Sequence, residues 1–112
     1  MGTLSYGPSA LQVEFDDRVL AHVQAVISVK IRRGESFMFS WFDTQAVGDG
    51  RSTIWISAEL PMFFRFSKSA PHRMNRQWLE SMVIAAGSSQ GLILTEEPDG
   101  KPVVSLDNSE KG

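Results

Sequence analysis

The chain has 112 residues, and 42% of them are apolar, so it can bury one hydrophobic core but is too short for two ordinary domains. It contains no cysteine, which excludes disulfides, thiolate metal sites and cysteine nucleophiles. With 11 basic and 13 acidic residues, the formal net charge of −2 gives no overall attraction to nucleic acid or to a membrane. We expect a single domain over residues 1–106 and a polar tail over residues 107–112.

Export and membrane signals are missing from the sequence. No apolar run approaches the roughly 20 residues that a membrane helix needs. The amino-terminal MGTLSYG has neither the basic nor the apolar region of a signal peptide. We therefore expect a soluble, cytoplasmic protein with no membrane partner.

The amino-terminal part predicts a hairpin followed by a helix. Short β-like runs over residues 3–6 and 11–15 flank a Gly-Pro-Ser turn. Asp16 suits the N-cap of a helix, and Asp17 suits the positive end of its dipole. Apolar residues then recur at helical spacing as far as Gly34, a residue typical of the position just after a helix.

Three aromatic-rich runs follow: FMFSWF at 37–42, TIWIS at 53–57 and MFFRF at 62–66. Each alternates apolar positions, and side chains of a strand point alternately to opposite faces, so each run can bury one face. Glycines between the first two runs favour a hairpin turn, and Pro61 separates the second run from the third. We expect three neighbouring strands of one antiparallel sheet.

The last third predicts a second helix and a closing hairpin. Apolar residues recur at helical spacing from about Asn75 to Ala86, and the runs 92–96 and 102–106 bracket a Pro-Asp-Gly turn. The element order is then ββαβββαββ. We predict an α+β fold with a mainly antiparallel sheet and two helices packed on one face. The expected core residues are Leu20, Val23, Ile27, Ile31, Phe37, Phe39, Trp41, Ile54, Ile56, Phe64, Phe66, Trp78, Leu79 and Met82.

Five stretches of the sequence carry a family resemblance: MGTLSYG, FDDRVLAH, KIRRGESFMFSW, GDGRSTIW and NRQW. Over Met1 to about Leu94 the chain resembles small, stand-alone bacterial proteins of uncharacterised function. Members of that group often carry the automatic label ATP-dependent DNA ligase, which implies a nucleophilic lysine in a Lys-x-Asp-Gly motif. The nearest match here is EPDG, where Glu97 stands in the lysine position, and the chain is shorter than a nucleotidyltransferase domain. We therefore exclude ligase activity.

A basic segment leads into the second predicted helix, and positions 60–79 contain no acidic residue. Basic side chains at a helix start oppose the helix dipole unless an anion lies nearby. This pattern predicts a site for a phosphate of a nucleotide or nucleic acid, or for a carboxylate of a protein partner. The alternative, which we favour, is that these residues are solvated and pair with Glu96, Glu97 and Asp99. The basic residues are Arg65, Lys68, His72, Arg73 and Arg76.

The far face of the predicted sheet is unusually apolar because it carries Met38, Phe42, Trp55 and Phe63. Such a patch often marks a protein interface when it exceeds a few hundred Å². Coverage by the terminal hairpins, or the opposite strand register, would explain the same pattern, and we favour coverage over a homodimer. Trp55 and Phe63 are expected on the same face as Arg65, where they would offer stacking surface to bases.

No catalytic or metal-binding constellation stands out. His22 and His72 each lack a second histidine at ligand spacing, and the serines lack the context of an activated nucleophile. We therefore expect a non-catalytic binding or accessory module without metal or cofactor. It would contact a protein partner that the sequence does not identify, or a second copy as a homodimer, through the sheet face and edge. The alternative is weak nucleic-acid or phosphate binding through the basic start of the second helix.

Overall fold

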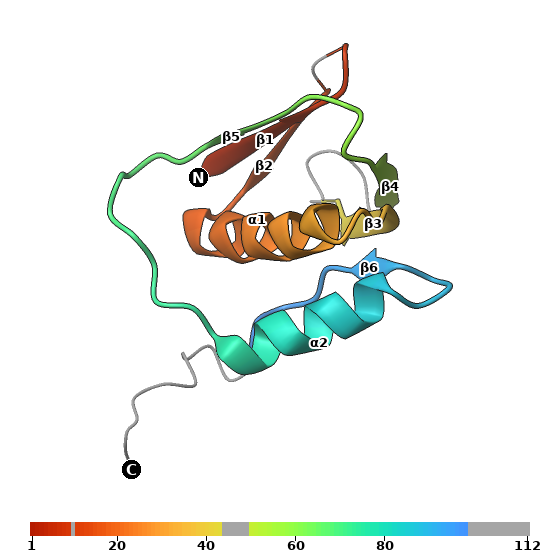
Figure 1. Ribbon diagram of the computed structural model, residues 1–112. Coiled ribbons are helices and arrows are strands. Elements are labelled where there is room, and N and C mark those ends of the chain that lie inside the picture. The colour runs from red at the N-terminus through yellow and green to blue at the C-terminus, as the bar shows by residue number, and fades with distance from the viewer. Residues whose placement is uncertain (10, 44–49, 99–112) are drawn as a thin grey trace.

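The computed structural model describes residues 1–9, 11–43 and 50–98. In chain order the elements are β1 (Gly2–Tyr6), β2 (Leu11–Phe15), α1 (Asp17–Arg32), β3 (Phe37–Phe42), β4 (Arg51–Ile56), β5 (Met62–Arg65), α2 (Arg76–Ala86) and β6 (Leu92–Ile93) (Figure 1). The α+β class and this order confirm the prediction. The predicted last strand, 102–106, and the predicted tail, 107–112, lie outside the described residues.

The strands form two three-stranded sheets, with the orders β2-β1-β5 and β4-β3-β6. Among the strands that the structure describes, β3 pairs with β6 in parallel and the other three pairs are antiparallel. The expectation that β5 follows β4 in one sheet is therefore wrong. Pro61 ends the turn after β4, its carbonyl accepts a 2.9 Å hydrogen bond from the Gly7 N–H, and the chain continues beside β1.

Local capping signals fix both ends of α1. The Asp16 carboxylate accepts the Arg18 N–H at 3.1 Å, as an N-cap should. At the other end Gly34 has a φ of 72°, and the Glu35 N–H donates to the Lys30 carbonyl at 3.0 Å. This is the left-handed helix termination that glycine permits.

The core lies between the two sheets and the helices. The ring of Phe15 at the end of β2 is 6.2 Å from that of Phe39 and 5.9 Å from that of Trp41, so the two sheets meet through aromatic side chains. α1 packs on β1, α2 packs on β3 and β6, and the helices pack on each other. The predicted core is confirmed, because nine of its residues are buried and the other five pack against them. The five partly buried residues are Ile31, Ile54, Phe64, Phe66 and Leu79.

A close backbone approach brings β6 to β3. Gly91 has a φ of 77°, and a Cβ at this position would lie 2.5 Å from the carbonyl oxygen of Met38. Only glycine allows that approach. Leu92 then lies opposite Phe39, and the Leu94 N–H donates to the Ser40 carbonyl at 2.9 Å. The chain after β6 leads back toward the start of α2.

Candidate functional site

The predicted basic residues lie on or beside one extended connection, residues 66–75, which we call the strap. Figure 1 shows it leaving β5 and passing the start of α1 before it enters α2. Arg65 ends β5 and Arg76 begins α2, and both are exposed. On the strap itself, Lys68 and Arg73 are exposed and His72 is half-buried. The structure thus places the five residues along one stretch of chain.

The strap is first tied to α1 by Asp17. Its carboxylate accepts the Ser67 hydroxyl at 2.8 Å, the Ser67 N–H at 3.2 Å and the Lys68 N–H at 3.1 Å. Hydrogen bonding by the Ser67 hydroxyl is the main cause that lowers the pKa of Asp17. From the sequence, Asp17 is expected only to stabilise the start of its own helix through the helix dipole. Its side chain also fixes the strap.

Arg18 makes the second tie. One guanidinium nitrogen, Nη1, donates to the Arg73 carbonyl at 2.7 Å. Nε and Nη2 donate to the two carboxylate oxygens of Glu97, each at 2.8 Å. This two-bond geometry is the strong form of an arginine–carboxylate pair. The hydrogen bonds from Arg18 are the main cause that lowers the pKa of Glu97 to about 2.

His22 makes the third tie, from a ring that is 0% exposed. Its Nδ1 lies 2.8 Å from the Arg18 carbonyl oxygen, and its Nε2 lies 2.8 Å from the Asn75 nitrogen. A carbonyl only accepts and a backbone N–H only donates, so the ring is neutral and carries its proton on Nδ1. Burial is the main cause that lowers the pKa of His22.

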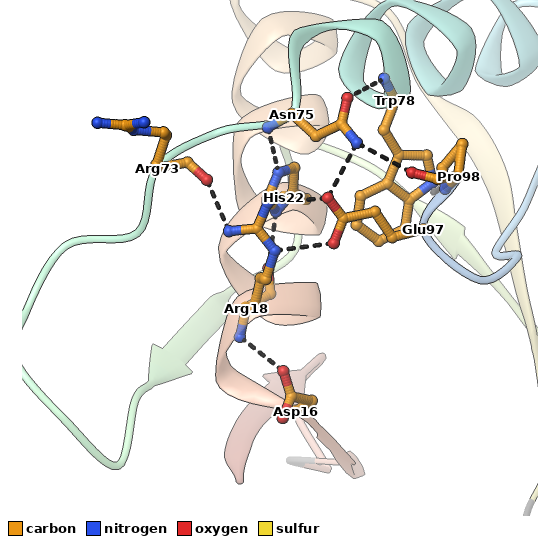
Figure 2. A network of polar contacts seen from close by, with 8 residues as sticks. All are labelled: Asp16, Arg18, His22, Arg73, Asn75, Trp78, Glu97 and Pro98. Carbon is orange, nitrogen blue, oxygen red and sulfur yellow. Dashed lines mark hydrogen bonds and ion pairs between the residues drawn. The ribbon is translucent and has the colours of Figure 1, made fainter. Parts of the chain in front are cut away.

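Asn75 joins these ties to the start of α2 (Figure 2). Its Oδ1 accepts the Trp78 N–H at 3.1 Å, so it is the N-cap of α2. Its Nδ2 donates to Glu97 at 2.9 Å and to the Pro98 carbonyl at 3.4 Å. Asn75 therefore uses an acceptor and a donor of one side chain at once, and an aspartate at this position would lack the donor.

The ring of Trp78 completes this buried cluster. It lies 4.8 Å from the His22 ring, centroid to centroid, at an interplanar angle of 38°. Trp78 is 1% exposed, and its indole Nε1 has no hydrogen-bond partner in the described part of the chain. Sequence periodicity predicts the burial of Trp78 but not its contact with a histidine of the other helix.

The anion near the start of α2 is a carboxylate of the chain itself. Glu97 lies beside the N-cap, where it contacts Arg18 and Asn75. We expected Glu97 to pair with the basic side chains of the strap, but its carboxylate binds Arg18 of α1 instead. In Figure 2 the Arg73 side chain extends away from this network, and its carbonyl is the part that faces Arg18. Glu96 is exposed, and Asp99 lies outside the described residues.

The predicted apolar patch divides between the two sheets. Met38, Phe42 and Trp55 form the outer patch on β3 and β4, where they are 40%, 64% and 53% exposed. Met38 lies directly opposite Trp55. Among the described residues nothing covers these three side chains, contrary to the favoured expectation of coverage within the monomer; the second strand of the predicted closing hairpin lies outside the described residues. Phe63 is 54% exposed but lies on β5, in the other sheet.

Phe63 and Arg65 lie on β5, whereas Trp55 lies on β4 in the other sheet. Because β5 pairs with β1 instead of β4, the expectation that Trp55 and Phe63 share one sheet face with Arg65 is wrong. The Arg65 guanidinium carbon lies 5.5 Å from the centre of the Phe63 ring, within the range of a cation–π contact. The sheets are linked near Trp55, whose carbonyl accepts a hydrogen bond from the Tyr6 hydroxyl.

A pocket of about 310 Å³ adjoins the outer patch, and Met38 and Trp55 form part of its wall. Its polar side carries Lys30, which is 5% exposed, and Glu35. The Lys30 Nζ lies 2.6 Å from a carboxylate oxygen of Glu35. Hydrogen bonding by Lys30 is the main cause that lowers the pKa of Glu35. An apolar surface thus borders a pocket with a charged pair.

The described ranges contain neither a metal-binding cluster nor a membrane-spanning helix. Among those residues, no group of three histidine, aspartate or glutamate side chains is placed to hold a metal ion. No described helix is both long and apolar enough to span a membrane.

These features define a small α+β domain with a polar network at the helix starts and an exposed apolar strand face. Residues 1–97 match the model of a family described as a domain of unknown function, DUF7882, and the match names no enzyme class. The chain belongs to this family. The matched region ends at Glu97, so the whole Arg18–Glu97 pair lies inside it. Searches of curated proteins and of solved structures found no match.

Proposed function

We propose that the protein is a small, non-catalytic binding module that contacts a protein partner through the outer patch. The exposure of Trp55 carries this proposal: its side chain is 53% exposed, whereas its strand neighbour Ile56 is 0% exposed. Large apolar side chains grouped on a surface favour protein contact, and tryptophan is enriched among the residues that dominate such contacts. We also propose that it acts in the bacterial cytoplasm; the family resemblance supports the bacterial origin.

The surroundings of the outer patch indicate the chemistry of the partner. Arg51 is exposed and lies opposite Phe42 at one end of the strand pair. The pocket of about 310 Å³ lies at the other end, beside Trp55. A partner that fits brings an apolar side chain onto Trp55, a projecting side chain into the pocket and an acidic group near Arg51.

Phe63 provides a matched control for Trp55, because the two aromatic side chains are almost equally exposed and lie on different sheets. We expect tagged wild-type protein and Phe63→Ser to retain the same bound protein from a native extract, and Trp55→Ser to lose it. Binding that survives high salt would match an apolar contact. A bound protein that Phe63→Ser loses and Trp55→Ser retains would contradict the proposal.

Sedimentation of the purified protein at micromolar concentration tests whether the partner is a second copy. If the partner is a second copy, the wild type and Phe63→Ser should sediment as dimers and Trp55→Ser should sediment as a monomer. A monomeric wild type would assign the outer patch to a different protein. The proposed function would be overturned if the wild type is monomeric and no protein from the extract needs Trp55 for binding.

A second candidate function is weak nucleic-acid or phosphate binding by Arg65, Lys68, His72, Arg73 and Arg76. One observation favours it: α1 ties the backbone of the strap and leaves Lys68 and Arg76 exposed. Arg65 also lies on the ring of Phe63, which offers an exposed face to a base. Such binding weakens steeply with salt because counterions are released.

The charge reversals Lys68→Glu and Arg76→Glu together test this second candidate. We expect them to abolish binding of a single-stranded oligonucleotide. The matched control replaces Arg32 and Arg33, at the far end of α1, with glutamate, which changes the net charge by the same amount. Equal losses in both double variants would show that only overall charge matters, and would contradict a site on the strap.

A further inference from the structure

The His22 ring has one position that can take up a second proton, and that position is occupied. Nδ1 already carries a proton, which it donates to the Arg18 carbonyl. The lone pair of Nε2 accepts the Asn75 N–H at 2.8 Å. A proton on Nε2 would place two N–H groups against each other, so the ring becomes charged only if Asn75 moves away.

Movement of Asn75 would affect three parts of the chain. Asn75 is the last residue of the strap, the N-cap that holds the Trp78 N–H, and a donor to the Glu97 carboxylate. Losing its position would therefore loosen the strap, the first turn of α2 and the segment around Glu97. The other ties of the strap, through Asp17 and Arg18, do not involve the His22 side chain.

Some charged groups around the His22 ring oppose its protonation and one favours it. The Arg18 guanidinium and His72 of the strap oppose a positive charge on His22, and the Glu97 carboxylate favours one. Glu97 is already bound to Arg18, and the neighbour from α2, Trp78, has no charge. Complete burial of the ring opposes the charged form most strongly. The neutral ring is therefore the form that the closed strap accommodates.

We propose that His22 is an acid-sensitive latch that holds the strap and the start of α2 against α1 while its ring is neutral and releases them when the ring is protonated. Release frees the Asn75 end of the strap and the first turn of α2, whereas the ties of the strap to Asp17 and Arg18 remain. The proposal concerns the strap and is independent of the outer patch. It requires no ligand, because a proton is the only species that the latch takes up.

The direction of the pH effect follows from linkage. An open or unfolded chain takes up the proton near the ordinary value of 6.5, whereas the closed chain takes it up only at a lower pH because the pKa of His22 is lowered. Opening of the strap is therefore suppressed above pH 6.5 and is increasingly favoured as the pH falls below 6.5. From pH 7 to pH 5.5, the population of the open strap should rise, by about tenfold at most. Glu97 remains ionised in this window because its pKa is about 2.

Amide hydrogen exchange measured by NMR on the full chain tests the latch. After correction for the intrinsic pH dependence of exchange, we expect the opening equilibrium at the Asn75 and Trp78 amides to rise from pH 7 to pH 5.5, by about tenfold at most. The Ile27 amide, in the middle of α1, should keep its protection. An opening equilibrium at Asn75 that is equal at both pH values would overturn the proposal.

The two histidines of the chain provide the variant and its control. His22→Gln should remove the pH dependence of opening at Asn75, and His72→Gln should retain it, because His72 is half-buried on the strap and does not bind Asn75. If His22→Gln does not fold, the ring ¹⁵N shifts of the wild type report directly whether protonation of His22 accompanies the opening at Asn75. A His22 ring that titrates near 6.5 without any opening at Asn75 would overturn the latch.

Discussion

The Asn75 N–H donates to Nε2 of His22 across 2.8 Å, and this hydrogen bond joins residues that are 53 positions apart. It is buried, and each partner has a second role: His22 binds its own helix through Nδ1, and Asn75 caps the other helix. The start of α2 is thus positioned by α1 through side chains, in addition to apolar packing. This relationship makes the stability of the strap depend on a few polar residues.

Removing Arg18 should destabilise the fold. Arg18→Met keeps much of the side-chain volume but leaves Glu97 without its main partner, and the Glu97 side chain is only 11% exposed. The carboxylate keeps its hydrogen bond from Asn75, and the loss of its charged partner at such a site costs about 2 kcal/mol. We expect a loss of that size in the free energy of unfolding, measured by urea titration at pH 7. A change below about 0.5 kcal/mol would contradict the importance of the pair.

The same variant has a defined pH signature. The pKa of Glu97 is lowered from 4.5 to about 2 in the folded chain, so its stabilising contribution is complete above pH 4.5 and is lost as the pH falls toward 2. Arg18→Met should return the pKa of Glu97 toward 4.5 and flatten this part of the stability curve. A wild type and a variant with parallel curves between pH 4.5 and 2.5 would contradict the assignment of the shift to Arg18.

Lys30→Met should cost less than Arg18→Met, although Lys30 is the more deeply buried cation. Its partner Glu35 has a 48% exposed side chain, so the carboxylate that remains is solvated by water. A buried ion pair stabilises little when its loss leaves no buried charge behind. Urea titration of the two methionine variants side by side makes the comparison. A larger loss for Lys30→Met would show that the ammonium supports the pocket beyond its contact with Glu35.

The sequence predicts those parts of the fold that depend on neighbours within a few residues. Asp16 caps α1 and Gly34 ends it, as expected, and α2 begins at about Asn75, as expected, because capping is decided within one helical turn. The buried face of β3 follows from the alternation of Phe37, Phe39 and Trp41. These features require no knowledge of how distant segments pair.

The strand order and the polar network depend on distant segments. Thr3 pairs with Arg65 across the β1–β5 ladder, and no local pattern separates that pairing from one between β5 and β4. Arg18 and Glu97 are 79 positions apart. One local signal was present: Arg18 and His22 stand four residues apart, on one side of the helix and next to its apolar stripe. Polar side chains in such a position often have a buried partner.

Asn75→Asp should destabilise the protein, although aspartate and asparagine are equally good N-caps in general. An aspartate keeps the acceptor for the Trp78 N–H, but it loses the donor to Glu97 and places a second carboxylate beside it. We expect a cost of about 1–3 kcal/mol at pH 7, because a buried group loses its partner. The cost should shrink in acid, where one of the two carboxylates is protonated.

The N-cap of α1 provides the control for this substitution. Asp16 is exposed and its carboxylate accepts only the Arg18 N–H among the described side-chain hydrogen bonds. Asp16→Asn should therefore change the free energy of unfolding by only a few tenths of a kcal/mol. Equal effects of the two exchanges in thermal unfolding would mean that Asn75 acts as an ordinary cap, without a special role in the network.

Gly91→Ala should detach β6 from β3, and Gly7→Ala is its matched control. Both glycines have a positive φ, 77° at Gly91 and 81° at Gly7, so both substitutions carry the left-handed penalty of about 1–2 kcal/mol. A Cβ at Gly7 meets nothing within 4 Å, whereas at Gly91 it would lie 2.5 Å from the Met38 carbonyl oxygen. Gly91→Ala should therefore lose clearly more stability in urea titration and expose the Leu94 amide to exchange. Equal losses would show that the loop before β6 moves aside without strain, and that the parallel pairing with β3 does not depend on the close approach at Gly91.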